Sequence, residues 1–144
     1  MKHLLTFIAI VTLTASICRA DGFEITGKTE TYTAKITFLK GQPVKGSNRV
    51  RIDIIDASSQ YVKDARVEIE YFMPSLPGKS PMMDYRTKAK RVGTSYEATL
   101  KLDMTGLWKM TLSVTRTKRT ERATIEFLVV GSGGSVGINQ TNSM

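Results

Sequence analysis

The chain has 144 residues, a formal net charge of +8, one cysteine and one histidine. This length suits a single domain, and a surplus of Lys and Arg favours contact with anionic surfaces without defining a fold. One cysteine and one histidine exclude an intrachain disulfide and any zinc site built from several such ligands.

The first twenty residues have the three parts of a secretory signal peptide. Lys2 and His3 supply a positive start, and residues 4–13 form an apolar run that is too short to span a bilayer. Small residues, Cys18 and Ala20, then precede the polar Asp21. We therefore expect cleavage after Ala20, and a periplasmic or secreted mature chain.

Two alternatives to cleavage after Ala20 remain open. Cys18 could be lipid-modified, although Ile17 stands where a lipoprotein site prefers a small side chain. The leader could also persist as an anchor, although no stop-transfer pattern follows it. Cleavage is the better explanation of all three parts, and we expect no transmembrane helix in the mature chain.

Cleavage would remove both Cys18 and His3. It would leave 124 residues and lower the formal net charge from +8 to +6, because Lys2 and Arg19 leave with the leader. Nucleophilic catalysis by a Cys/His or Ser/His/Asp set is then excluded, as are haem and zinc sites that need those residues. We expect no enzyme and no nucleic-acid partner, and methionine is the only soft ligand that remains.

Apolar and polar residues alternate with period two in most of the mature sequence, which predicts half-buried strands. The predicted strands cover 31–39, 50–54, 65–71, 85–90, 96–102, 108–114 and 123–129. About seven short antiparallel strands with one apolar face each must pack sheet on sheet. This predicts an immunoglobulin-like β-sandwich with Trp108 near the core centre.

The predicted domain covers 21–130, and a flexible Gly/Ser-rich tail covers 131–144. Turn signals separate the strands, among them 46–48, 56–59 and 93–95. The strand at 85–90 is basic on one face, which suits an exposed sheet edge that must not pair with another chain.

The segment 71–84 is predicted to be a loop between the third and fourth strands, and it contains three prolines and three methionines. Thioether sulfur is a soft ligand that selects Cu(I) over harder divalent ions. We therefore take Met73, Met82 and Met83 as candidate Cu(I) ligands, with Met104 on the same rim. Tyr71 or Asp84 could assist them.

Packing is the competing explanation for these methionines. Methionine fills irregular gaps at the ends of sandwiches, and Met73 continues an inward-facing strand pattern. Met110 falls within an apolar alternation and is predicted to be core. Without three converging sulfurs the segment would be only an ordered rim.

Two charged groups are weaker candidates for a function. Glu68 and Glu70 share one face of a strand and could act as an acid/base pair, although a solvated face explains them better. Four basic residues near 116–122 are predicted to form an exposed hairpin tip that could bind an acidic partner or lipid headgroups, although a solvated turn is the simpler explanation. They are Arg116, Lys118, Arg119 and Arg122.

The order of several short motifs resembles the YtkA-like / FixH-like family of exported domains. The motifs lie at 46–56, 64–67, 96–98 and 104–108, with Met73-Pro74 and Met82-Met83 between them. The resemblance covers about Lys28 to Val130. It implies an immunoglobulin-like sandwich, an envelope location and a connection with metal efflux or copper-oxidase assembly.

Two functions are therefore expected to compete. The first is a copper-handling module that binds Cu(I) through the Met-Pro segment. The second is a protein-interaction or assembly module that docks on an envelope or efflux complex without metal, through the Met-Pro rim or the basic edge strand.

Overall fold

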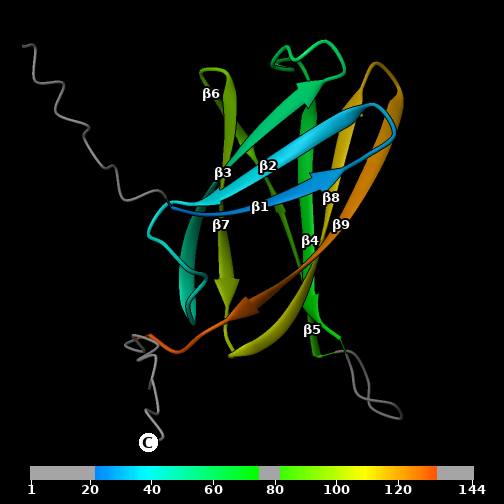
Figure 1. The fold of residues 1–144 in the computed structure, drawn as a ribbon. Coiled ribbons are helices and arrows are strands. Elements are labelled where there is room, and N and C mark those ends of the chain that lie inside the picture. The colour runs from blue at the N-terminus through cyan, green and yellow to red at the C-terminus, as the bar shows by residue number, and fades with distance from the viewer. Residues whose placement is uncertain (1–21, 75–81, 133–144) are drawn as a thin grey trace, which may run out of the picture.

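The described part of the chain folds into nine antiparallel strands arranged in two layers (Figure 1). The computed structural model describes residues 22–74 and 82–132, except for the side chains of Met82 and Met83. The strands are β1 (Phe23–Lys28), β2 (Tyr32–Phe38), β3 (Gly46–Asp56), β4 (Arg66–Met73), β5 (Met82–Lys88), β6 (Lys90–Val92), β7 (Ser95–Leu102), β8 (Gly106–Arg116) and β9 (Arg119–Val129).

The two layers are a five-stranded sheet and a four-stranded sheet packed face to face. Their strand orders are β1-β2-β3-β7-β6 and β5-β4-β8-β9. The predicted all-β sandwich is confirmed, with nine strands where about seven were expected. The two additional strands, β1 and β6, are short strands at the edges of the five-stranded sheet.

The predicted turn at 46–48 is wrong, because β3 begins at Gly46 and pairs there with Leu102 of β7. Asn48 faces inward and is only 6% exposed. Its side-chain amide donates to the carbonyl of Val44 at 2.7 Å, and its oxygen accepts the Val44 N–H at 3.0 Å. These bonds satisfy a polar side chain in a buried strand position, and so the strand continues through it.

The basic segment 85–90 is not one strand, since the chain changes sheets at Ala89. The segment before it belongs to β5, at the edge of the four-stranded sheet, and β6 after it is the edge of the five-stranded sheet. The Ala89 N–H donates to the carbonyl of Val67 at 2.9 Å. The expected basic edge is therefore divided between the two sheets.

The core lies between the sheets and consists of the inward residues of the alternating strands. Trp108 is 1% exposed, as predicted, and Met110 is fully buried. Tyr71 and Tyr85 stack at a ring-centroid distance of 5.3 Å, and Trp108 lies 6.0 Å from Tyr71. Phe38 packs against Phe23 of its own sheet and against Phe127 of the opposite sheet.

Two buried tyrosine hydroxyls connect segments that belong to different parts of the sandwich. The Tyr71 hydroxyl on β4 accepts the N–H of Lys101 on β7 at 2.9 Å. The Tyr96 hydroxyl on β7 donates to the carbonyl of Val62 at 2.8 Å and accepts the N–H of Ala65 at 3.0 Å. These bonds hold the two sheets and the β3–β4 loop together without a disulfide.

Within the described residues, no helix has the length and apolar character needed to cross a membrane. The expected signal peptide and most of the expected C-terminal tail lie outside the described residues. The cleavage site and the domain bounds 21–130 therefore stay predictions.

We expect Met110→Ala to lower the free energy of unfolding by about 2–5 kcal/mol, because it leaves a cavity between the sheets. Met110→Leu conserves the volume and should cost less than about 1.5 kcal/mol. Urea denaturation of the two variants measures both values. Equal stability of the alanine variant and the parent would contradict the assignment of Met110 to the core.

Candidate functional sites at the two ends of the sandwich

The predicted methionine loop is shorter than the segment 71–84, because both flanking strands extend into it. Strand β4 continues to Met73 and β5 begins at Met82, so that residues 74–81 connect them. Met73 and Met82 are opposite each other in the β4–β5 pairing, and the register shifts between Phe72 and Met73. Two of the candidate ligands are thus backbone neighbours across the strand pair.

Met73 is half-buried and packs against the edge of the core. Its Cε lies 3.0 Å from the position that a Cβ on Gly106 would occupy, and Gly106 has a φ of +125°. Both facts favour glycine there, because a side chain would be strained and would also press on the thioether. The start of β8 therefore lies directly beside Met73.

The turn that carries Met104 is held against β5 and β8 by two hydrogen bonds. The Tyr85 hydroxyl donates to the carboxylate of Asp103, and this bond, more than partial desolvation, raises the pKa of Tyr85 above its ordinary value. The Trp108 Nε1–H donates to the carbonyl of Met104 at 2.9 Å. The Met104 side chain itself is 40% exposed.

The structure thus brings Met73, the backbone of Met82 and the Met104 turn to one end of the sandwich. We call Met73, Met82, Met83 and Met104 the methionine rim. The side chains of Met82 and Met83 lie outside the described part of the chain, so whether the sulfurs converge stays a prediction. Within that part, no group of three or more His, Cys, Asp or Glu residues has the arrangement of a metal site.

The two residues expected to assist the methionines differ in solvent exposure. Tyr71 is buried, and its hydroxyl accepts the Lys101 N–H, which commits it to the core. Asp84 is exposed and is opposite Phe72 in the strand pairing. Asp84 is therefore the more accessible of the two.

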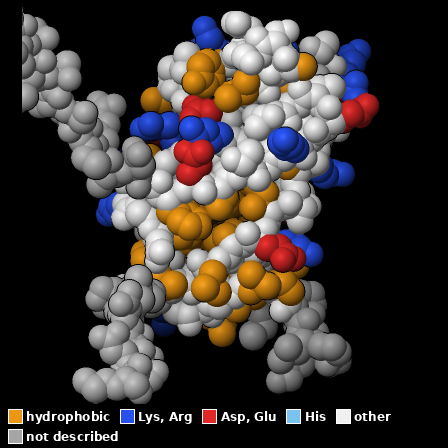
Figure 2. Space-filling model, in the orientation of Figure 1, with side chains coloured by type: hydrophobic (Ala, Val, Ile, Leu, Met, Phe, Trp, Pro, Cys, Tyr) orange, Lys and Arg blue, Asp and Glu red, His pale blue; other side chains and the backbone are white. Residues whose placement is uncertain are grey.

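Exposed apolar side chains lie next to the rim in sequence and register. Leu107 is 48% exposed and Leu128 is 59% exposed, and the two are direct partners in the β8–β9 pairing. In the view of Figure 2, hydrophobic side chains are frequent at the lower end, while most Lys and Arg side chains lie above it. On the face in this view, the surface near the rim is therefore mainly apolar.

Glu68 and Glu70 lie on the outer face of β4, where they take part in ion pairs. Glu70 pairs with Arg86 of β5, and Glu68 lies 4.0 Å from Arg66. Their partners are cross-strand and same-face neighbours, which is the ordinary arrangement of charges on an exposed sheet. This geometry favours the solvated face over an acid/base pair.

The predicted basic hairpin tip is the β8–β9 turn at the opposite end. Thr117 and Lys118 form the turn with φ values of 48° and 66°, which is typical of a tight two-residue hairpin loop. Arg116 pairs with Asp64 at 2.9 Å, and Arg119 pairs with Glu30 at 2.7 Å. Two of the four basic side chains are therefore engaged within the fold.

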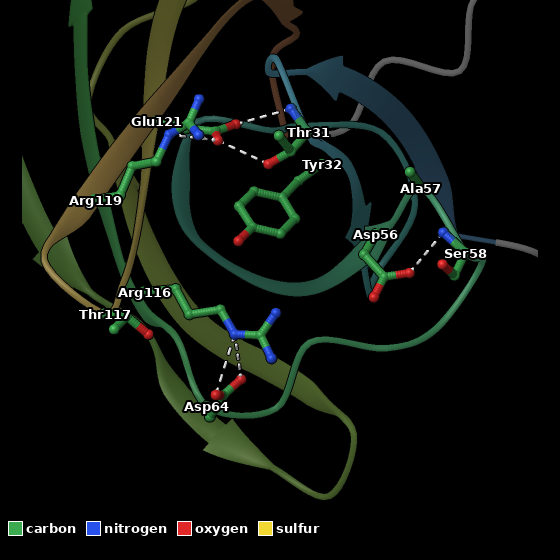
Figure 3. A pocket seen from close by; sticks show the side chains of 10 residues that line it. All are labelled: Thr31, Tyr32, Asp56, Ala57, Ser58, Asp64, Arg116, Thr117, Arg119 and Glu121. Atoms are coloured by element: carbon green, nitrogen blue, oxygen red, sulfur yellow. Dashed lines mark hydrogen bonds and ion pairs between the residues drawn. The ribbon is translucent and has the colours of Figure 1, made fainter.

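A cleft of about 550 Å³ opens beside this hairpin, between it, the β1–β2 turn and the loop after β3 (Figure 3). Its lining residues are Thr31, Tyr32, Asp56, Ala57, Ser58, Asp64, Arg116, Thr117, Arg119 and Glu121. Sequence reasoning did not identify this cleft. The available signal was Glu121, an acid that occupies an inward position in the alternation of β9.

Glu121 is 8% exposed and fastens the β1–β2 turn to β9. Its carboxylate accepts the Thr29 hydroxyl at 2.6 Å, and the Thr31 hydroxyl and N–H at 2.7 and 2.9 Å. Arg119 Nε lies 3.3 Å away. The threonine hydrogen bonds, with a smaller contribution from Arg119, lower the pKa of Glu121 from 4.5 to about 2.

Two comparisons with known proteins bear on this architecture. A model of the family described as YtkA-like matches residues 26–113, which is more than half of the chain. The crystal structure of the PmoD soluble domain from Methylocystis sp. ATCC 49242 (Rockwell) is similar, with a TM-score of 0.50 and 16% identity, covering 72% of this chain and 96% of that chain. At this identity the likeness shows the fold alone. No curated protein sequence matches the chain.

We expect the Glu121 carboxylate to make stability depend on acid pH. Its pKa is lower in the folded state, so its contribution is complete above about pH 4.5 and is lost as pH falls toward about 2. Urea unfolding of the parent and of Glu121→Gln between pH 6 and pH 2.5 measures this. The difference between them should shrink as pH falls, and two parallel curves would contradict the assignment.

Proposed function

The chain belongs to the YtkA-like family, and we propose that it is an exported, non-enzymatic binding module that takes up Cu(I) at the methionine rim. The ion is the cargo of the module, received and passed on in the bacterial envelope. Met73, Met82 and Met83 supply the thioether ligands, and Met104 joins them from the neighbouring turn.

The observation that carries this proposal is the meeting of two separate segments at one end of the sandwich. The β4–β5 pairing sets Met73 opposite Met82. Met73 Cε lies 3.0 Å from the position that a Cβ on Gly106 would occupy, so the start of β8, and the turn before it that carries Met104, lie beside Met73. Methionines 31 residues apart in sequence thereby share one rim.

The chemistry of these side chains supports a soft monovalent ion. Thioether sulfur is uncharged and polarisable, and such ligands prefer Cu(I) to harder divalent ions. Met104 is exposed and Met73 is half-buried, so an ion at the rim would be reached from solvent and backed by the core. An exposed thioether site suits transfer better than permanent storage.

Titration of the mature chain with Cu(I) against a competing chelator tests the proposal. We expect saturable binding of Cu(I), and loss of most of that affinity in the variant Met73→Leu/Met82→Leu/Met83→Leu, because leucine keeps the volume and removes the sulfur. Met104→Leu should weaken binding to a smaller extent.

Met110→Leu is the matched control, because this methionine is fully buried away from solvent. It should bind Cu(I) as the parent does. Unchanged affinity for Cu(I) in the triple rim variant would contradict the copper proposal. Ag(I) provides a second, redox-inert soft ion for the same comparison.

A second candidate function is favoured by the exposed Leu107–Leu128 pair beside the rim. In this alternative the same end docks on a membrane-bound envelope complex without metal. Exposed apolar patches on small proteins commonly mark such interfaces.

In-cell crosslinking of the parent and of Leu107→Glu/Leu128→Glu tests the docking function. The parent should be recovered with one membrane complex whether or not copper is chelated, and the variant should lose it. Thr111→Glu/Thr124→Glu is the control, because these threonines are also outward partners in β8 and β9. A parent chain that stays monomeric under crosslinking would count against docking.

A further inference from the structure

The cleft beside the β8–β9 hairpin continues into a second, smaller hollow. This hollow of about 240 Å³ is lined by residues of the β1–β2 turn and shares Thr31, Tyr32, Asp56 and Ala57 with the first. The two hollows share these residues and together form one groove. The β1–β2 and β8–β9 turns that border it lie at the end of the sandwich opposite the start of β5 and β8 (Figure 1). Tyr32 and Asp56 belong to both parts of this groove.

The walls of the groove are held in place by hydrogen bonds within the fold. Glu121 binds the β1–β2 turn through Thr29 and Thr31. Asp56 Oδ1 accepts the N–H groups of Ser58 and Gln60 at 2.9 and 3.0 Å, which fixes the turn after β3. A site whose walls are ordered before binding loses little entropy when a ligand enters.

Charge in the groove is nearly balanced. Its cations are Lys28, Arg116 and Arg119, and its carboxylates are Glu30, Asp56, Asp64 and Glu121. Three of the carboxylates form ion pairs with the two arginines. The groove therefore has little surplus of either sign with which to select a phosphate or an amine.

The groups that remain for a ligand alternate between hydrogen-bond donors and acceptors around an aromatic ring. Figure 3 shows the Tyr32 ring in the centre of the cleft, between Arg116 and Asp56. The Arg116 Nε binds Asp64 and the guanidinium also hydrogen-bonds the Tyr32 hydroxyl, which leaves its other N–H groups as donors for a ligand. The second oxygen of Asp56 is an acceptor, since its backbone contacts use Oδ1.

We propose that this groove binds a neutral polyhydroxylated ligand of the saccharide class. The ring of Tyr32 presents an apolar face to the C–H surface of a sugar ring, and Arg116 and Asp56 bind its hydroxyl groups as donor and acceptor. Polar side chains in fixed positions around one aromatic ring supply the orientation and specificity that a ligand with many hydroxyl groups needs. Because Tyr32 and Asp56 line both hollows, we take the groove as one extended site and test it with short oligosaccharides.

NMR titration of the ¹⁵N-labelled mature chain with chitotriose and maltotriose tests the proposal, with inorganic phosphate and putrescine as anionic and cationic comparisons. We expect saturable shifts around residues 31–32, 56–58 and 116–119 with at least one trisaccharide. Phosphate and putrescine should bind more weakly. No saturable shifts with either trisaccharide, or tighter binding of a charged probe, would overturn the proposal.

Two variants test the named residues while leaving the Glu121 hydrogen bonds and the two backbone contacts of residue 56 in place. Tyr32→Leu should weaken sugar binding about tenfold, which corresponds to about 1.4 kcal/mol of lost ring contact. Asp56→Asn keeps an oxygen for the two N–H groups but turns the second acceptor into a donor, and should weaken binding similarly. Tyr61→Leu is the control, because this exposed tyrosine lies outside the lining of both hollows. Equal affinity in all three variants would falsify the assignment.

Discussion

Two tyrosine hydroxyls, buried between the sheets, hold the sandwich in register. Tyr71 reaches from β4 to the backbone of β7, and Tyr96 of β7 reaches to both sides of the β3–β4 loop. A buried hydroxyl without a partner would be costly, so each tyrosine is stable only when the opposite sheet or loop is in place. The sheets in turn set the positions of both ends, since the rim follows β4 and the hairpin cleft lies against the loop that Tyr96 holds.

The alternation of apolar and polar residues was sufficient to predict the architecture, because a long strand with one buried face produces this pattern in the sequence. The two strands that it did not reveal lack this signal. In β1 a glycine takes the third inward position, and a Cβ there would lie 2.6 Å from Ile125. All three residues of β6 are exposed, so it has no apolar face. The change of sheets at Ala89 depends on the pairing partners β4 and β7, and these lie elsewhere in the chain.

The candidate sites also differ in how much of their geometry can be inferred from the sequence. Met73 and Met82 are close in sequence, so their association could be proposed from composition, and the strand pairing explains it. The approach of the Met104 turn to this region depends on Gly106, and the sequence alone did not establish it. The cleft at the other end was missed because Glu121 binds Thr29 and Thr31, about 90 residues away. An acid in an inward strand position was the one visible sign that such partners existed.

The β8–β9 hairpin joins these two ends. Its strands run from Gly106 and Val129 at the rim to Arg116 and Arg119 at the cleft. Eleven extended residues span about 33 Å at roughly 3.3 Å per residue. This is about four times the Debye length of roughly 8 Å at physiological ionic strength. A charge at one end would therefore be almost completely screened at the other, and the two proposed sites would be occupied independently.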